Sequence, residues 1–211
     1  MGIISYLVGL MRETLIWLAD VTGSYGVGII LLTILIRAAL YPLTLSQMKS
    51  AVAMRALQPK MKELQERYKE KPEEYQKRVL QLYRENKVNP LGGCLPLLIQ
   101  LPFMWALYVV LRDFDFHTRF LVWDLAGAAK DPLFILPVLT GLTMYLQSAM
   151  TLTDPSQRAI VWIFPIFMAW VTTNFPAGLA IYWVVSNLVS IGQQYLLMRQ
   201  TGTPRAGGAT R

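Results

Sequence analysis

The chain has 211 residues, of which 54% are hydrophobic and only 16% are charged, and its formal net charge is +7. This composition, with six Trp and ten Tyr, is typical of an integral membrane protein rather than a soluble domain. The single cysteine, Cys94, excludes an intramolecular disulfide. We predict an all-α integral membrane protein that forms one helical bundle.

The N-terminal segment is apolar but short. Ten residues, Gly2 to Met11, precede Arg12 and Glu13, whereas crossing the hydrocarbon core of a bilayer takes about 20 helical residues. An early basic region and a small-residue cleavage site, the marks of a secretory signal, are not evident. We therefore predict that residues 1–22 form an amphipathic helix lying in the membrane interface.

The next segment, 23–45, contains the most informative residue. Arg37 is the only charged residue in the apolar run from Tyr25 to Leu45, which is long enough to predict a transmembrane helix. An intramembrane cation normally faces a bundle interior or a wet cavity. The alternative is that Arg37 snorkels to the headgroups, but roughly 12 Å of helix separates it from Leu45.

Residues 46–89 are polar and carry helical periodicity. Apolar residues recur at helical spacing on both sides of Lys71 and Pro72, which predicts a helical hairpin with its turn at this dipeptide. Pro59 is expected to disturb the first helix or to mark a break in it. Each helix has one thin apolar stripe, so the hairpin should be loosely packed.

The remaining chain, 90–198, predicts four more spans. They cover residues 90–111, 132–150, 159–175 and 178–198, and a short basic tail, 199–211, follows. The hairpin segment holds eleven Lys or Arg against six Glu, whereas residues 112–131 hold three basic and four acidic residues. Because basic residues stay cytoplasmic, the N-terminus is predicted outside and the C-terminus inside. The charge excess reflects this topology alone, or additionally a partner such as ribosomal RNA or anionic lipid.

Polar side chains form stripes on three of the predicted spans. Residues spaced by three or four positions lie on one face of a helix. Three sets of polar or aromatic residues have this spacing: Thr33, Arg37, Tyr41 and Thr44; Thr140, Thr143, Gln147 and Thr151; and Trp183, Ser186, Asn187, Ser190 and Gln194. Gln100 marks the second span. These stripes could line a hydrophilic groove, or provide interhelical hydrogen bonds of about 0.6 kcal/mol each. For Arg37 with Gln100 and Gln147 we favour a cavity, since a guanidinium needs water or several acceptors.

Most catalytic chemistry is missing from the spans. None of them contains Asp, Glu, His or Lys, so the sequence offers no proton relay and no carboxylate cage for a cation. The only histidine, His117, falls in a predicted outside loop. No phosphate-binding loop, metal-ligand cluster or activated nucleophile is present, and we expect neither a cofactor nor an enzymatic activity.

Several motifs together resemble a known family. They are RAALYPLTLSQ (37–47), MRALQPKMKEL (54–64), NPLGGCLPLLIQLP (89–102), DPSQ (154–157) and FPAGLAIYWVVSNLVSIGQQ (175–194). Their order and spacing resemble the YidC/Oxa/Alb membrane protein insertases, with the nearest likeness to the bacterial YidC branch. The resemblance covers roughly residues 23–199.

The resemblance implies five spans around a groove that opens to the cytoplasm and to lipid. Arg37 matches the family's groove arginine, which would attract the polar tail of a nascent membrane protein while the apolar segment passes into lipid without nucleotide hydrolysis. Gln147 and Trp183 resemble groove-lining residues, and Tyr182 resembles a substrate contact; Gln100 and Ser186 complete the expected groove. The implied location is the bacterial plasma membrane. The implied partners are nascent membrane proteins, the ribosome and signal recognition particle pathway, the Sec translocon and the bilayer.

Two departures from the family pattern and two rival functions stay open. We expect the protein to be without the extra N-terminal span, the periplasmic domain and the lipid-modified cysteine of some relatives, and we do not expect its short basic tail to tether ribosomes stably. One rival is a non-catalytic assembly factor that uses its spans as helix-binding surface. The other is a small transporter with an anion site at Arg37, which the lack of inverted repeats disfavours.

Overall fold

The computed structural model describes residues 2–86, 88, 95–113, 119–125, 129–151 and 158–201. Within them the chain is helical apart from one antiparallel pair of two-residue strands, so the all-helical prediction holds except for that pair. Cys94, His117, the DPSQ motif and residues 202–211 lie outside the described residues. The elements are α1 Ile3–Thr22, α2 Tyr25–Ala39, α3 Tyr41–Arg67, α4 Pro72–Glu85, α5 Leu95–Asp113, β1 Arg119–Phe120, β2 Trp123–Asp124, α6 Ile135–Thr151, α7 Arg158–Thr172 and α8 Ala177–Thr201.

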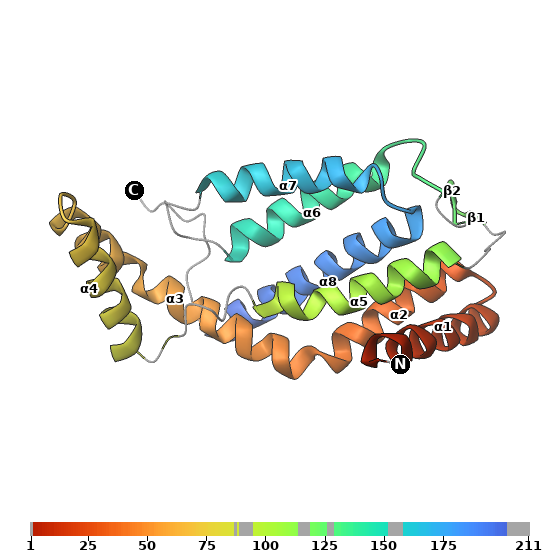
Figure 1. Ribbon diagram of the computed structural model, residues 1–211, viewed down its shortest axis with the longest axis horizontal. Helices are drawn as coiled ribbons and strands as arrows, with labels where there is room; N and C mark the ends of the chain where they lie inside the picture. Colours follow the sequence, from red (N-terminus) through yellow and green to blue (C-terminus); the bar gives the residue numbers. More distant parts are fainter. Residues whose placement is uncertain are drawn as a thin grey trace.

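Helix α8 is the centre of the bundle (Figure 1). It packs against α2, α5 and α6, while α1 covers α2 and α5, and α7 lies along α6. The α3–α4 hairpin extends away from one end of the bundle, and the short β1–β2 pair lies at the opposite end. Segments from both halves of the sequence therefore meet on α8.

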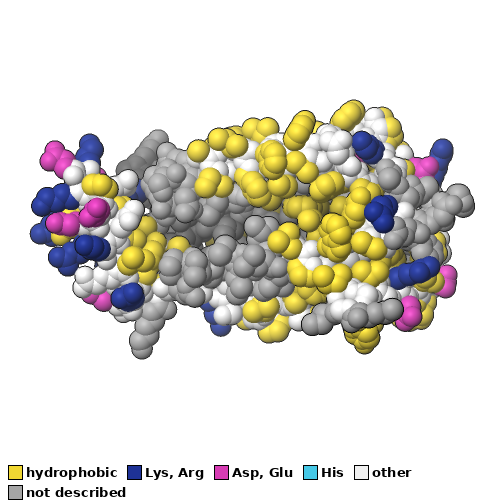
Figure 2. All heavy atoms as spheres, in the orientation of Figure 1, with side chains coloured by type: hydrophobic (Ala, Val, Ile, Leu, Met, Phe, Trp, Pro, Cys, Tyr) yellow, Lys and Arg dark blue, Asp and Glu magenta, His cyan; other side chains and the backbone are white. Residues whose placement is uncertain are grey.

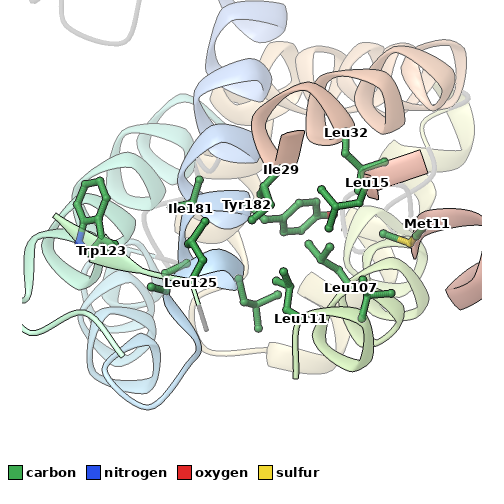
Figure 3. Packing of buried hydrophobic residues seen from close by; sticks show 14 of the residues in the cluster. Met11, Leu15, Ile29, Leu32, Leu107, Leu111, Trp123, Leu125, Ile181 and Tyr182 are labelled. Carbon is green, nitrogen blue, oxygen red and sulfur yellow. The ribbon is translucent and has the colours of Figure 1, made fainter. Parts of the chain in front are cut away.

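The apolar core lies among α1, α2, α5 and α8. Figure 3 shows the Tyr182 ring of α8 amid Leu15, Ile29 and Leu107, one from each of the other three helices. Tyr182 is only 2% exposed and Leu15 is fully buried. A Cβ at Gly28 would lie 3.3 Å from the Leu15 Cδ1 atom, so the missing side chain at this position lets α1 approach α2 closely.

The first predicted span is not one helix, which corrects the expectation of a continuous helix over 23–45. Helix α2 ends at Ala39, and the axis turns by 64° before the helix that begins at Tyr41. Pro42 lies in the first turn of α3, where its missing N–H leaves no hydrogen bond unmade and its fixed backbone angle favours the start of a new helix. Among the described residues this bent pair passes a length-and-hydropathy criterion for crossing a membrane, and no single helix does.

Helix α1 is more deeply packed than a helix that only lies on a surface. Met11, Leu15, Leu18 and Ala19 are buried, and their spacing places them on one face of the helix. The remaining surface still exposes large apolar side chains, including Tyr6 and Trp17. Its position in the membrane interface stays a prediction; the structure adds that one face belongs to the core.

The hairpin begins earlier than predicted. Helix α3 starts at Tyr41 and runs without a break through Pro59 to Arg67, so the expected disruption at Pro59 is wrong: a helix can continue past a proline by giving up one backbone hydrogen bond. Helix α4 starts at Pro72, where the sequence predicts it. The Tyr83 hydroxyl donates to the Met61 sulfur at 3.3 Å and links the two helices. Figure 2 shows basic and acidic side chains mixed over this end of the molecule.

Residues 129–131 join three elements at the end of the bundle opposite the hairpin. The Ala129 carbonyl accepts a hydrogen bond from the Ala177 N–H at 2.8 Å, at the start of α8. Lys130 donates to the Asn174 side chain, between α7 and α8. The Asp131 carboxylate accepts from the N–H of Leu136 at 2.6 Å, in the first turn of α6. We call this segment the clamp.

Candidate functional site

Arg37 lies in the last turn of α2 and points toward α8. Its Nε donates a hydrogen bond to the Ser186 hydroxyl at 2.8 Å, and Ser186 is buried. One turn earlier, Thr33 is fully buried and its hydroxyl donates to the Ile29 carbonyl of its own helix. Arg37 is thus the polar group by which α2 reaches across to α8.

A second polar contact reaches α8 from α5. The Gln100 side-chain amide donates a hydrogen bond to the Tyr182 hydroxyl. Tyr182 precedes Ser186 by one helical turn, so both side chains lie on the same face of α8. Arg37 and Gln100, from helices far apart in sequence, therefore converge on adjacent positions of one helix face.

The α6 side of α8 has its own polar contact. The Asn187 side-chain amide donates to the Thr143 hydroxyl at 3.1 Å. Trp183 shares this face with Asn187 by its spacing and is half-buried; its ring centroid lies 6.3 Å from that of Phe175. Gln147 is half-buried on α6, one turn beyond Thr143.

The predicted site residues therefore divide between two neighbouring faces of α8. Tyr182 and Ser186 meet α5 and α2, whereas Trp183 and Asn187 turn toward α6. The expected stripe on the first span is interrupted, because Tyr41 falls beyond the bend and is exposed. The sequence indicated which residues are polar, but the pairing of Asn187 with Thr143 needed the relative rotation of α6 and α8.

One buried polar residue was not predicted as part of the site. Gln47, in α3, is buried and its Nε2 atom has no hydrogen-bond partner. The signal that could have identified it is its place at the end of the RAALYPLTLSQ motif, ten residues after Arg37. Gln194 in α8, which the sequence placed in a polar stripe, is likewise buried and its Nε2 atom has no hydrogen-bond partner.

The site carries one positive charge without an acidic partner among the described residues. An ion pair elsewhere in these residues joins Lys71 and Glu74 on the hairpin, at 3.7 Å. The described residues also contain no cluster of His, Cys, Asp or Glu able to hold a metal ion. A guanidinium bonded to a neutral hydroxyl group keeps further N–H donors that can bind an anionic or strongly polar segment by charge-assisted hydrogen bonds.

An apolar helical bundle whose central polar side chains are hydrogen-bonded to one another is the architecture of helical membrane proteins. Within this class, a family model described as "60Kd inner membrane protein" matches residues 17–204. The chain belongs to this family of bacterial inner membrane proteins, the YidC/Oxa/Alb family, as its motifs predicted.

Individual relatives agree with this assignment. Proteins named membrane protein insertase YidC are 40% identical over 182 residues in Caldanaerobacter subterraneus and 40% identical over 190 residues in Geobacter sulfurreducens. The alignments cover 86% and 88% of this chain, but 88% of the first relative and only 36% of the second. The chain therefore spans about a third of the longer relative.

A solved structure gives the same answer for the fold. A crystal structure described as an active YidC insertase with its first transmembrane domain resolved is 32% identical to this chain, with a TM-score of 0.77. The match covers 90% of this chain and 46% of that one. The bundle around α8 is accordingly an architecture found in an insertase.

Proposed function

We propose that this protein is a membrane protein insertase, as its relatives are named, and that Arg37 receives the polar tail of the substrate. The observation that carries the proposal is the position of Arg37: a cation inside the bundle, bonded to a neutral serine and free of an acidic partner among the described residues. Such a cation is costly in a membrane and normally faces a bundle interior or a wet cavity, which supports a functional role.

The driving force lies in the substrate. An apolar segment of about 20 residues gains roughly 25 cal/mol for each Å² of apolar surface removed from water, so its transfer into lipid needs no nucleotide. The obstacle is the polar tail, whose desolvation in hydrocarbon is unfavourable. Arg37 and its polar neighbours would replace part of the lost hydration and lower that barrier.

The remaining site residues have roles in this proposal. Gln100 and Tyr182 bond each other between α5 and α8 and would hold the α5 side of a hydrophilic groove next to Ser186. Gln147 and Trp183, both half-buried, would line its α6 side. The groove would open to the cytoplasm and to lipid, in a five-span protein with its N-terminus outside and its C-terminus inside.

The partners are also part of the proposal. Nascent small membrane proteins would be the substrates, delivered by the ribosome and the signal recognition particle pathway, with or without the Sec translocon. The α3–α4 hairpin, exposed and charged, would be the cytoplasmic contact surface for this machinery.

The decisive experiment uses the purified full chain in liposomes. A single-span substrate with an acidic N-terminal tail is added, and the protease-protected fraction is measured for the wild-type protein, Arg37→Ala and empty liposomes. We expect insertion by the wild-type protein and a loss of about tenfold or more with Arg37→Ala, as for a hydrogen bond to a charged group.

The control is Arg119→Ala, which removes an exposed arginine from β1 and should insert as the wild-type protein does. A substrate with a neutral tail should be less sensitive to Arg37→Ala than one with an acidic tail. Wild-type insertion no greater than that of empty liposomes would contradict the proposal and favour a non-catalytic assembly factor.

A further inference from the structure

Two buried glutamines, one on α3 and one on α8, have side-chain nitrogens without a partner among the described residues. Gln47 is 8% exposed and Gln194 is 4% exposed. The Nε2 atom of each is buried and makes no hydrogen bond in the described part of the chain. An unpaired buried donor is destabilising, and departures of this kind from good packing concentrate at functional sites.

Gln194 continues the face of α8 that contacts Arg37. Ser186, Ser190 and Gln194 are spaced four residues apart and therefore lie in one row, and all three are buried. The Ser190 hydroxyl donates to the Ser186 carbonyl at 2.9 Å, so it is satisfied within its own helix. Gln194 lies roughly 12 Å farther along the axis than Ser186. Unlike the Ser190 hydroxyl, its side-chain amide nitrogen has no hydrogen-bond partner.

Gln47 lies on α3, a second helix that follows the Arg37–Ser186 contact. It lies in the second turn of α3, just beyond the bend that follows Arg37, and α3 packs against both α5 and α8. The two amides thus lie on α3 and α8, the two helices that run from the Arg37–Ser186 contact toward the hairpin end of the molecule.

The chemistry of these groups identifies their ligand. A primary amide is uncharged and both donates and accepts hydrogen bonds, as a peptide group does. Main-chain carbonyl and N–H groups are present in every polypeptide whatever its side chains, so these amides match the backbone of an entering chain.

We propose that Gln47 and Gln194 bind the main chain of the substrate's polar segment on its way to Arg37. This inference rests on the proposed insertase function. It divides recognition between two parts of the path: the glutamines hold any unfolded polar segment irrespective of sequence, and Arg37 favours the acidic ones. The glutamines act as substrate-binding residues and take no part in a covalent step.

The test replaces each amide with a thioether of similar shape. Gln47→Met, Gln194→Met and the double variant are compared with Gln76→Met, which changes an exposed glutamine on α4. Two quantities are measured: the melting temperature of the purified protein, and insertion into liposomes of substrates with neutral Ser/Asn-rich tails or acidic tails. We expect an unchanged or higher melting temperature, because an unpaired amide is removed, together with a loss of insertion of about threefold or more for each variant.

The loss should be equal for neutral and acidic tails, unlike that of Arg37→Ala. Full insertion by the double variant would overturn the inference while leaving the insertase function intact. Melting temperature and insertion falling together would also overturn it, because the amides would then be structural groups satisfied by buried water. If the wild-type protein itself fails to insert, the proposed function fails and this inference with it.

Discussion

The two ends of the molecule are built in different ways. Around Tyr182, four helices bury apolar side chains so completely that Leu15 and Leu107 have no exposed surface. In the α3–α4 hairpin, Gln47 and Met48 are buried near the bundle, and farther along, the described residues with buried side chains are Leu57 and Tyr83, at 6% and 8% exposed. Packing fixes the bundle, whereas local signals such as Pro72 shape the hairpin. The difference suggests a rigid frame for the site and a mobile arm beside it.

Truncating one buried leucine in each region should give the largest difference in stability between the bundle and the hairpin. Leu15→Ala leaves a cavity among helices that cannot easily close it, so we expect a loss of about 2 to 5 kcal/mol in the free energy of unfolding. Leu57→Ala, between two helices that can shift, should cost less than half as much. Denaturant titration of both variants measures the two losses. Equal losses would show that the hairpin is packed as firmly as the bundle.

A smaller effect is expected when single polar contacts are removed. A double-mutant cycle on Asn187→Ala and Thr143→Val should give a coupling of about 0.6 kcal/mol, the usual size for a hydrogen bond between membrane helices. Tyr83→Phe removes the hydroxyl bonded to Met61 in the hairpin and should change stability less, because sulfur is a weak acceptor. A larger loss for Tyr83→Phe would reverse the comparison.

The smallest effect is expected at the ion pair of the hairpin. Lys71 and Glu74 are 3.7 Å apart, with side chains 68% and 52% exposed, and exposed pairs contribute about 0 to 1 kcal/mol. Glu74→Gln should therefore leave the free energy of unfolding nearly unchanged at any salt concentration. Its matched control is Glu73→Gln on the neighbouring residue, and a clear difference between them would show that the pair matters.

Much of the architecture could be predicted from the sequence. Apolar runs and the Lys71–Pro72 break are local signals, so helices appear close to their expected positions. Arg37 stands out because a charge in an apolar run is rare. The bend at Leu40 was missed because hydropathy continues unbroken through it, although Pro42 is a helix-starting residue.

The contacts between helices were less predictable. Gln100 and Tyr182 were both expected in the site, but their hydrogen bond depends on how α5 is rotated against α8. The buried face of α1 was hidden because Arg12 and Glu13, on its exposed side, made the segment resemble a surface helix. The β1–β2 pair was also missed, since strands of two residues have no periodicity to detect.

The clamp has a mechanical consequence. Three successive residues tie the start of α6, the α7–α8 connection and the start of α8 to one another, all at the end opposite the hairpin. Two helices joined at one end can separate by rotating about that end, and the displacement grows with distance from the joint. If α6 and α8 separate to admit a substrate, the opening is therefore widest at the end of α8 that contains Gln194.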